Sequence, residues 1–153
     1  MAARTVHQWF AEYGESHQHP TNTLIHWICV PAIFLSIIGL LFSIPVPGAM
    51  PGIVAYAATA LALLFYLRLS VPLFFGLLLW CALCLWVCRA IHLSGAWPLW
   101  AVSLTVFVLA WIGQFYGHQV EGKKPSFLKD VQFLLIGPAW LMGKLFRRLG
   151  IAY

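Results

Sequence analysis

The stretch LIHWICVPAIFLSIIGLLF, which runs from Leu24 to Phe42, decides the fold of this protein. It contains no lysine, arginine or carboxylate, and most of its side chains are large and apolar. A helix needs roughly 20 apolar residues to cross the hydrocarbon core of a bilayer. We therefore expect this stretch to form a membrane-spanning helix.

Three further stretches of similar character follow along the chain. They are Ile53 to Leu69, Val71 to Cys88, and Trp97 to Phe115. The segment 43–52 between the first two spans has three prolines and two glycines, which predicts a loop. Only Ser70 and Pro72 punctuate the next boundary, so spans two and three are expected to form a tight helical hairpin. The span 53–69 is the weakest of the four because it carries Arg68 near its end.

The composition agrees with a membrane protein. Hydrophobic residues make up 62% of the 153 residues and charged residues 8%, whereas soluble domains are about a quarter charged. The net charge of +5 is attributed to topology and lipid headgroups, and no nucleic-acid partner is expected. All four cysteines lie in apolar stretches and predict no disulfides. We expect one membrane-embedded domain over 1–153.

The basic residues predict the orientation of the chain. An even number of spans returns it to its starting side, and one side then holds all but one of the lysines and arginines, with only Arg89 opposite. Cytoplasmic loops carry an excess of such residues. Both termini are therefore expected in the cytoplasm, in the inner membrane of a bacterium or the endoplasmic reticulum of a eukaryote. The residues on the cytoplasmic side are Arg4, Arg68, Lys123, Lys124, Lys129, Lys144, Arg147 and Arg148.

The segment 127–148 is apolar but interrupted. It contains Lys129, Asp130 and Lys144, and Gly137-Pro138 breaks it. A helix that lies in the membrane interface, with basic residues on anionic headgroups, is predicted here. The expected fold class is all-α, a polytopic membrane protein with four transmembrane helices and a C-terminal interfacial helix.

Histidines gather on the side of the membrane where both chain ends meet. His17 and His26 precede or begin the first span, and His118 follows the last. In one unbroken helix His17 and His26 would point about 180° apart, but Pro20 breaks the chain between them, and Thr21 or Asn22 is then free to cap the following helix. Neutral imidazole is the commonest metal ligand, so these three histidines are predicted to bind a metal ion.

Other polar residues share the same region. Gln114, His118 and Glu121 fall on one helix face, because residues three, four and seven apart are neighbours on a helix. Glu121 is expected either as a further ligand or as the partner that fixes a histidine tautomer. Gln114, Tyr13 and Asn22 are expected to orient ligands or substrate.

Two motifs carry a resemblance to a known family. The first is YGESHQHPTNTLIHWICVP, which begins at Tyr13 and ends at Pro31, and the second is QFYGHQVEGKKP, which begins at Gln114 and ends at Pro125. In this order, on either side of four apolar spans, they resemble the 2-hydroxy fatty acid dioxygenase family of small membrane proteins. The likeness covers nearly the whole chain.

The resemblance implies an Fe(II)-dependent enzyme. Its substrates would be dioxygen and a 2-hydroxy fatty acid, and its product the fatty acid one carbon shorter. It implies that His17, His26 and His118 bind the iron. The acyl chain would lie among the spans, in contact with membrane lipids, while Lys123, Lys124 or Arg4 attracts the carboxylate.

Two other classes compete with this hypothesis. Three histidines and a water also describe catalytic zinc, so a zinc-dependent membrane lipid hydrolase with Glu121 as general base is an alternative. A non-catalytic membrane protein is the other, in which the polar residues only cap helices and anchor the interface.

Overall fold

The computed structural model describes residues 4–125 and 132–153, and every regular element in these ranges is a helix. The prediction of an all-α protein is therefore confirmed. The helices are α1 (Val6–Gly14), α2 (Pro20–Phe42), α3 (Ile53–Leu69), α4 (Val71–Ser94), α5 (Leu99–Glu121) and α6 (Phe133–Arg148).

Three of the described helices, α2, α4 and α5, are long and apolar enough to cross a membrane. Helix α3 is apolar but has only 17 residues, which at roughly 1.5 Å per residue spans about 26 Å, less than the ~30 Å hydrocarbon core. The predicted count of four spans is therefore not confirmed. The predicted hairpin is confirmed, because Ser70 ends α3 and also caps the start of α4.

The helices extend beyond the predicted spans, because a helix does not stop where its apolar residues stop. Helix α4 continues past Cys88 to Ser94, and α5 continues past Phe115 to Glu121. Helix α2 begins at Pro20, before the predicted start. The prediction that Thr21 or Asn22 caps α2 is wrong. His19 is the cap: its Nδ1 accepts a hydrogen bond from the Thr21 amide at 3.2 Å, and proline suits the first helical position that follows.

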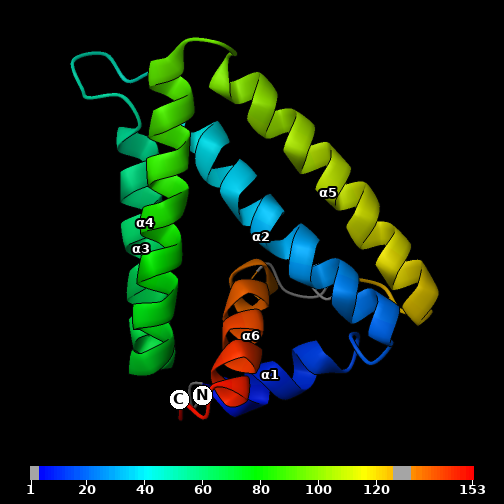
Figure 1. The fold of residues 1–153 in the computed structure, drawn as a ribbon. Helices are drawn as coiled ribbons and strands as arrows, with labels where there is room; N and C mark the ends of the chain where they lie inside the picture. The colour runs from blue at the N-terminus through cyan, green and yellow to red at the C-terminus, as the bar shows by residue number, and fades with distance from the viewer. Residues whose placement is uncertain (1–3, 126–131) are drawn as a thin grey trace.

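Helices α2 and α5 lie side by side along most of their lengths (Figure 1). Glycines permit this close approach. A Cβ atom on Gly113 would lie 2.7 Å from the Cys29 Sγ atom, and one on Gly117 would overlap the side-chain oxygen of Asn22. This pairing brings the start of α2 to the end of α5, as the sequence predicted.

The α3–α4 hairpin and the α2–α5 pair diverge toward the end of the molecule where both chain termini lie, and α1 and α6 occupy the space between them (Figure 1). Aromatic side chains join these two helices. The Trp9 ring packs edge-on against Phe133 with 5.4 Å between the ring centroids, and the centroids of Tyr13 and Trp140 are 5.3 Å apart. Helix α1 begins with a capping box between Thr5 and Gln8.

Helix α6 differs in its bounds and continuity from the predicted segment 127–148. It covers Phe133–Arg148, and the earlier part of the predicted segment lies outside the described residues. It continues through Pro138 rather than breaking there, and half of its residues are buried against α1, α2 and α4. The Tyr66 hydroxyl also donates to the Leu135 carbonyl at 3.0 Å. Helix α6 is thus packed into the bundle, and its position at the membrane interface stays a prediction.

Candidate metal centre

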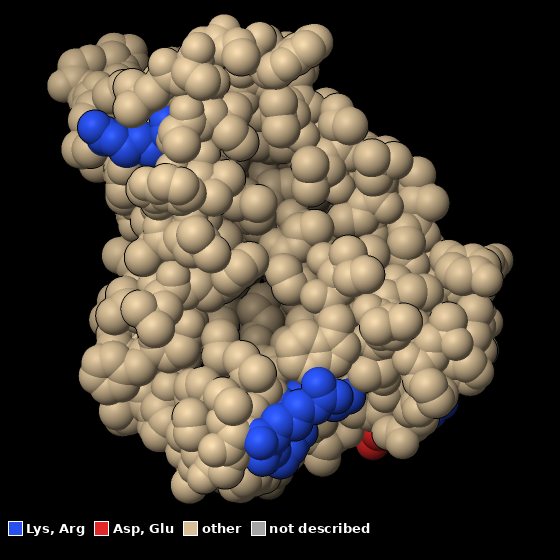
Figure 2. Space-filling model, in the orientation of Figure 1, with Lys and Arg blue, Asp and Glu red and all other residues tan. Residues whose placement is uncertain are grey.

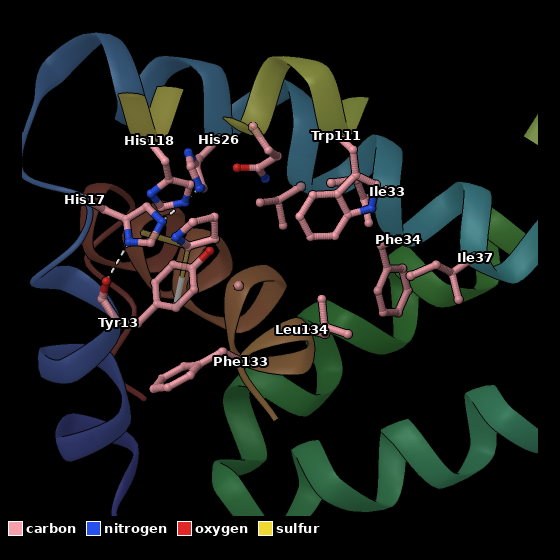
Figure 3. Close-up of a pocket in the computed structure, with 14 residues that line it drawn as sticks. Tyr13, His17, His26, Ile33, Phe34, Ile37, Trp111, His118, Phe133 and Leu134 are labelled. Atoms are coloured by element: carbon pink, nitrogen blue, oxygen red, sulfur yellow. Dashed lines mark hydrogen bonds between the residues drawn. The ribbon is translucent and has the colours of Figure 1, made fainter. Parts of the chain in front are cut away.

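Three buried imidazoles converge where α1, α2 and α5 meet. His17 follows α1, His26 lies in the second turn of α2, and His118 lies in the last turn of α5. Their exposed fractions are 4%, 1% and 5%, and one ring nitrogen from each lies within 4.8 Å of the others. Figure 3 shows the three rings pointing toward one another at one end of a pocket. The structure thus brings together the three predicted metal ligands, whose role stays a prediction.

The protonation of two of these rings follows from their hydrogen bonds. His17 Nδ1 lies 2.5 Å from the Tyr13 carbonyl oxygen, and His26 Nδ1 lies 2.8 Å from the Asn22 carbonyl oxygen. A carbonyl can only accept, so each Nδ1 carries the proton. A neutral imidazole has one N–H, which leaves both Nε2 atoms with bare lone pairs. Burial lowers the pKa of His17 to about 4, so this ring is neutral at pH 7.

The two bare nitrogen atoms face each other. His17 Nε2 and His26 Nε2 are 2.8 Å apart, a separation at which two lone pairs repel unless a cation lies beside both. Ligands at ~2.1 Å from one metal ion are about 3 Å apart when the angle between them is near 90°. His118 completes the set, and its Nδ1 is buried without a hydrogen-bond partner. The donor chemistry therefore fits a transition-metal ion.

The pocket beyond the histidines is apolar and elongated. Its empty volume is about 500 Å³. Along α2 it runs from His26 to Ile37, about 17 Å at the rise of an α-helix. Figure 3 shows Ile33, Phe34 and Ile37 at the end away from the histidines. The remaining lining residues are Tyr13, His17, Val30, Trp111, Gln114, His118, Pro125, Phe133, Leu134 and Gly137.

Two of the predicted orienting residues line this pocket. Gln114 is 5% exposed, and its Oε1 atom has no hydrogen-bond partner among the described residues. Tyr13 stacks on the His17 ring, with 4.1 Å between the centroids, and burial raises the pKa of its phenol. Tyr13 is therefore protonated at neutral pH and can donate a hydrogen bond.

The other two predicted residues, Asn22 and Glu121, lie outside the pocket lining. The Glu121 carboxylate accepts from the backbone amides of Gln18 and His19 at 2.8 Å each, and from Asn22 Nδ2 at 3.1 Å. Asn22 Nδ2 also donates to the Ser16 carbonyl at 3.0 Å. Glu121 therefore bonds to no imidazole ring among the described residues, and it is not part of the three-histidine cluster. It fastens the end of α5 to the turn that carries His17.

The remaining histidines and the candidate carboxylate anchors lie elsewhere. His7, His19 and His92 are not part of the three-histidine cluster. Arg4 forms an ion pair with Glu12 at 3.1 Å, and the Lys123 ammonium donates to the Glu15 carbonyl at 2.6 Å. Lys124 is exposed. No lysine or arginine lines the pocket in the described ranges 4–125 and 132–153.

The contribution of α6 to the site was not predicted. The ring centroids of Trp140 and His17 are 5.4 Å apart. The pocket is also lined by three residues of α6, Phe133, Leu134 and Gly137. A Cβ atom on Gly137 would lie 3.0 Å from the Tyr13 hydroxyl. The pair Gly137-Pro138 could have indicated a close helix contact, but from sequence it indicated a break.

Comparison with known proteins agrees with this geometry. The profile of the family described as "2-hydroxy-palmitic acid dioxygenase Mpo1-like" matches residues 3–149. The 2-hydroxy-palmitic acid dioxygenase MPO1 of Saccharomyces cerevisiae is 29% identical over 142 residues, covering 90% of this chain and 78% of the yeast protein. No solved structure matches the chain. The resemblance found in the two sequence motifs is thereby confirmed, and the chain belongs to the Mpo1-like family of 2-hydroxy-palmitic acid dioxygenases.

Proposed function

We propose that this protein is an Fe(II)-dependent dioxygenase that converts a 2-hydroxy fatty acid into the fatty acid one carbon shorter. The family supports a 2-hydroxy fatty acid dioxygenase role. The observation that carries the iron site is the pair of bare Nε2 atoms, on His17 and His26, that face each other at 2.8 Å. With His118, they would hold the ion through three neutral nitrogens and leave further coordination positions for ligands.

The pocket supports a long-chain substrate whose polar head lies at the histidines. Its walls are apolar for about 17 Å along α2. Since no described lysine or arginine lines it, the charge of the substrate carboxylate needs a cation at the histidine end. A 2-hydroxy acid offers a carboxylate and a hydroxyl on adjacent carbons, so both can bind one metal ion. The expected anchors Lys123, Lys124 and Arg4 are not required.

The reaction balances without an external reductant. A 2-hydroxy acid and one O₂ give the shortened acid, CO₂ and water: the bond between C1 and C2 breaks, these two carbons lose four electrons, and O₂ gains four. Bound iron would supply the redox chemistry. The Gln114 Oε1 atom, which lacks a hydrogen-bond partner among the described residues, would accept a hydrogen bond from the substrate hydroxyl. The Tyr13 hydroxyl, which also lines the pocket, would donate a hydrogen bond to an oxygen of the head group.

We infer an integral membrane location with both termini in the cytoplasm. The three long apolar helices support a membrane protein, and both described chain ends lie at the same end of the molecule (Figure 1). The excess of lysine and arginine at that end supports the cytoplasmic side. Dioxygen and the fatty acid, both soluble in lipid, would reach the pocket from the bilayer.

Reconstitution without oxygen tests the proposal. The purified full chain is loaded with Fe(II), 2-hydroxypalmitate is added, and air or ¹⁸O₂ starts the reaction. Mass spectrometry should detect pentadecanoic acid labelled in its carboxyl group, and only when both iron and oxygen are present. Absence of a shortened acid across several chain lengths would contradict the proposal. The zinc-hydrolase alternative would instead give stoichiometric zinc and an oxygen-independent hydrolysis.

A further inference from the structure

A second apolar groove lies on the opposite side of α2 and α6 from the histidine pocket. Its empty volume is about 500 Å³. Figure 2 shows this face of the molecule, hollowed between α4, α2 and α6. Neither the proposed reaction nor the three-histidine cluster uses it. The groove is lined by Trp27, Pro31, Leu77, Trp80, Pro138, Leu141, Met142 and Leu145.

A cation lies at the groove's end near the chain termini. The guanidinium carbon of Arg148 is 5.5 Å from the centre of the Trp27 ring, which lines the groove. Lys144 and Arg147 belong to the same two turns of α6, and lysine and arginine side chains gather below the hollow in Figure 2. In the described parts of the chain, no carboxylate lies within ion-pair distance of these three residues, since the ion pair found there joins Arg4 and Glu12.

The two neighbours of Arg148 already have partners. The Lys144 ammonium lies 3.6 Å from the centre of the Trp140 ring, and Arg147 donates a hydrogen bond to the Tyr153 hydroxyl. Arg148 is exposed, and its guanidinium lies over the face of Trp27. Its five N–H donors suit a phosphate group, which guanidinium binds in a bidentate manner.

The dimensions match one leaflet of a bilayer. From Arg148 to Pro138, α6 rises about 15 Å, which is half of the ~30 Å hydrocarbon core. A phosphate at Arg148 would place the start of an acyl chain beside Leu145 and its middle beside Pro138. Aromatic residues such as Trp27 favour the boundary between headgroups and hydrocarbon.

From this arrangement we propose that the groove binds one acidic phospholipid of the surrounding membrane, with its phosphate on Arg148 and an acyl chain between α2, α4 and α6. The site is separate from the catalytic pocket and does not depend on the proposed reaction. Charge complementarity selects the headgroup, because a cation without a carboxylate partner stands at the end of an apolar groove.

Native mass spectrometry of the full chain in detergent tests this site. Phosphatidylglycerol and phosphatidylcholine of identical acyl chains are titrated separately, and one bound phosphatidylglycerol should be retained with at least fivefold higher affinity. Arg148→Gln should weaken its binding about fivefold, in line with the loss of one cation at a lipid surface. Leu145→Trp should weaken the binding of both lipids. Leu145 lines the groove and is 38% exposed, so a larger ring at this position can fill the groove.

Two matched variants serve as controls. Arg89→Gln removes a cation from the far end of α4, and Leu149→Trp adds a ring at an exposed position outside the groove; both should leave lipid binding unchanged. Equal affinity for the two lipids, or full phosphatidylglycerol binding by Arg148→Gln, would overturn the proposal. Displacement of the lipid by one equivalent of 2-hydroxypalmitate would overturn it too, because the groove would then be a fatty-acid site.

Discussion

The histidine pocket and the phospholipid groove are built from the same two helices. His26 faces the pocket and its neighbour Trp27 faces the groove; Gly137 faces the pocket and its neighbour Pro138 the groove. One residue step turns the side chain by about 100° on a helix, so α2 and α6 form the wall between two cavities. Both cavities have an empty volume of about 500 Å³ and apolar walls.

What differs is the chemistry at the polar end. The pocket ends in imidazoles that are at most 5% exposed and present bare nitrogens, so in the proposed function it would bind a cation and through it an anionic head group. The groove ends in the exposed guanidinium of Arg148, which attracts the anion directly. Burial suits chemistry that must exclude water, whereas exposure suits exchange with the bilayer. Both cavities have apolar walls suited to an acyl chain, so the few polar atoms at one end of each would determine which ligand binds.

Removal of one imidazole should have the largest effect. In His118→Ala, iron binding to the full chain should fall below detection and turnover should drop more than about 100-fold, because two neutral nitrogens remain. Metal analysis and the pentadecanoate assay measure both. His92→Ala, outside the cluster, is the control and should retain both, while phosphatidylglycerol binding should survive in either variant. A folded His118→Ala protein with full iron content would contradict the three-histidine site.

The sequence predicted the histidine cluster far better than the apolar walls of the pocket beside it. The spacing of His17, Pro20 and His26, together with the return of the chain at His118, predicted the cluster, because the order of spans fixes which chain ends meet. The all-α class followed from apolar length alone. These features depend on residues close in sequence or on the topology of the whole chain.

The contribution of α6 and the role of Glu121 could not be predicted in the same way. Helix α6 enters the bundle because its small residues Gly137 and Gly143 fit against aromatic side chains of α1 and the C-terminus, a match of shapes far apart in the sequence. Glu121 bonds to the backbone amides of Gln18 and His19. Because every residue except proline has a backbone amide, such a hydrogen bond cannot be recognised from residue types. From the sequence, the Glu121 carboxylate was therefore expected to be a metal ligand, the partner of a histidine or a general base.

Substitution of Glu121, which joins the end of α5 to the turn of His17, should have the next largest effect on the site. Glu121→Gln should lower iron affinity about tenfold, because an amide replaces a carboxylate that accepts three hydrogen bonds and positions the turn of His17. Competition with a chelator measures the affinity. Glu15→Gln changes an exposed carboxylate on the same turn and should have no effect. A Glu121→Gln enzyme that keeps its iron affinity but loses turnover would instead support Glu121 as a general base.

Close packing of α2 and α5 predicts a smaller loss of stability. Gly117→Ala should destabilise the protein by about 2 kcal/mol, since the added Cβ overlaps Asn22 and forces the helices apart. Thermal unfolding in detergent measures the change. Gly14→Ala is the matched control, because its Cβ would meet nothing closer than 3.9 Å. Equal melting temperatures for the two variants would contradict the close contact of α2 and α5.

The smallest effect concerns the far end of the pocket, where the comparison with the groove is sharpest. Ile37→Trp should shorten the space for the acyl chain and lower kcat/KM for 2-hydroxypalmitate about tenfold relative to 2-hydroxylaurate, a typical discrimination by an apolar pocket. Ile28→Trp, on the same helix but 68% exposed, should leave the ratio unchanged. An unchanged ratio in Ile37→Trp, combined with a changed ratio in the groove variant Leu145→Trp, would mean that the substrate chain lies in the groove and that the wall formed by α2 and α6 does not separate two ligands.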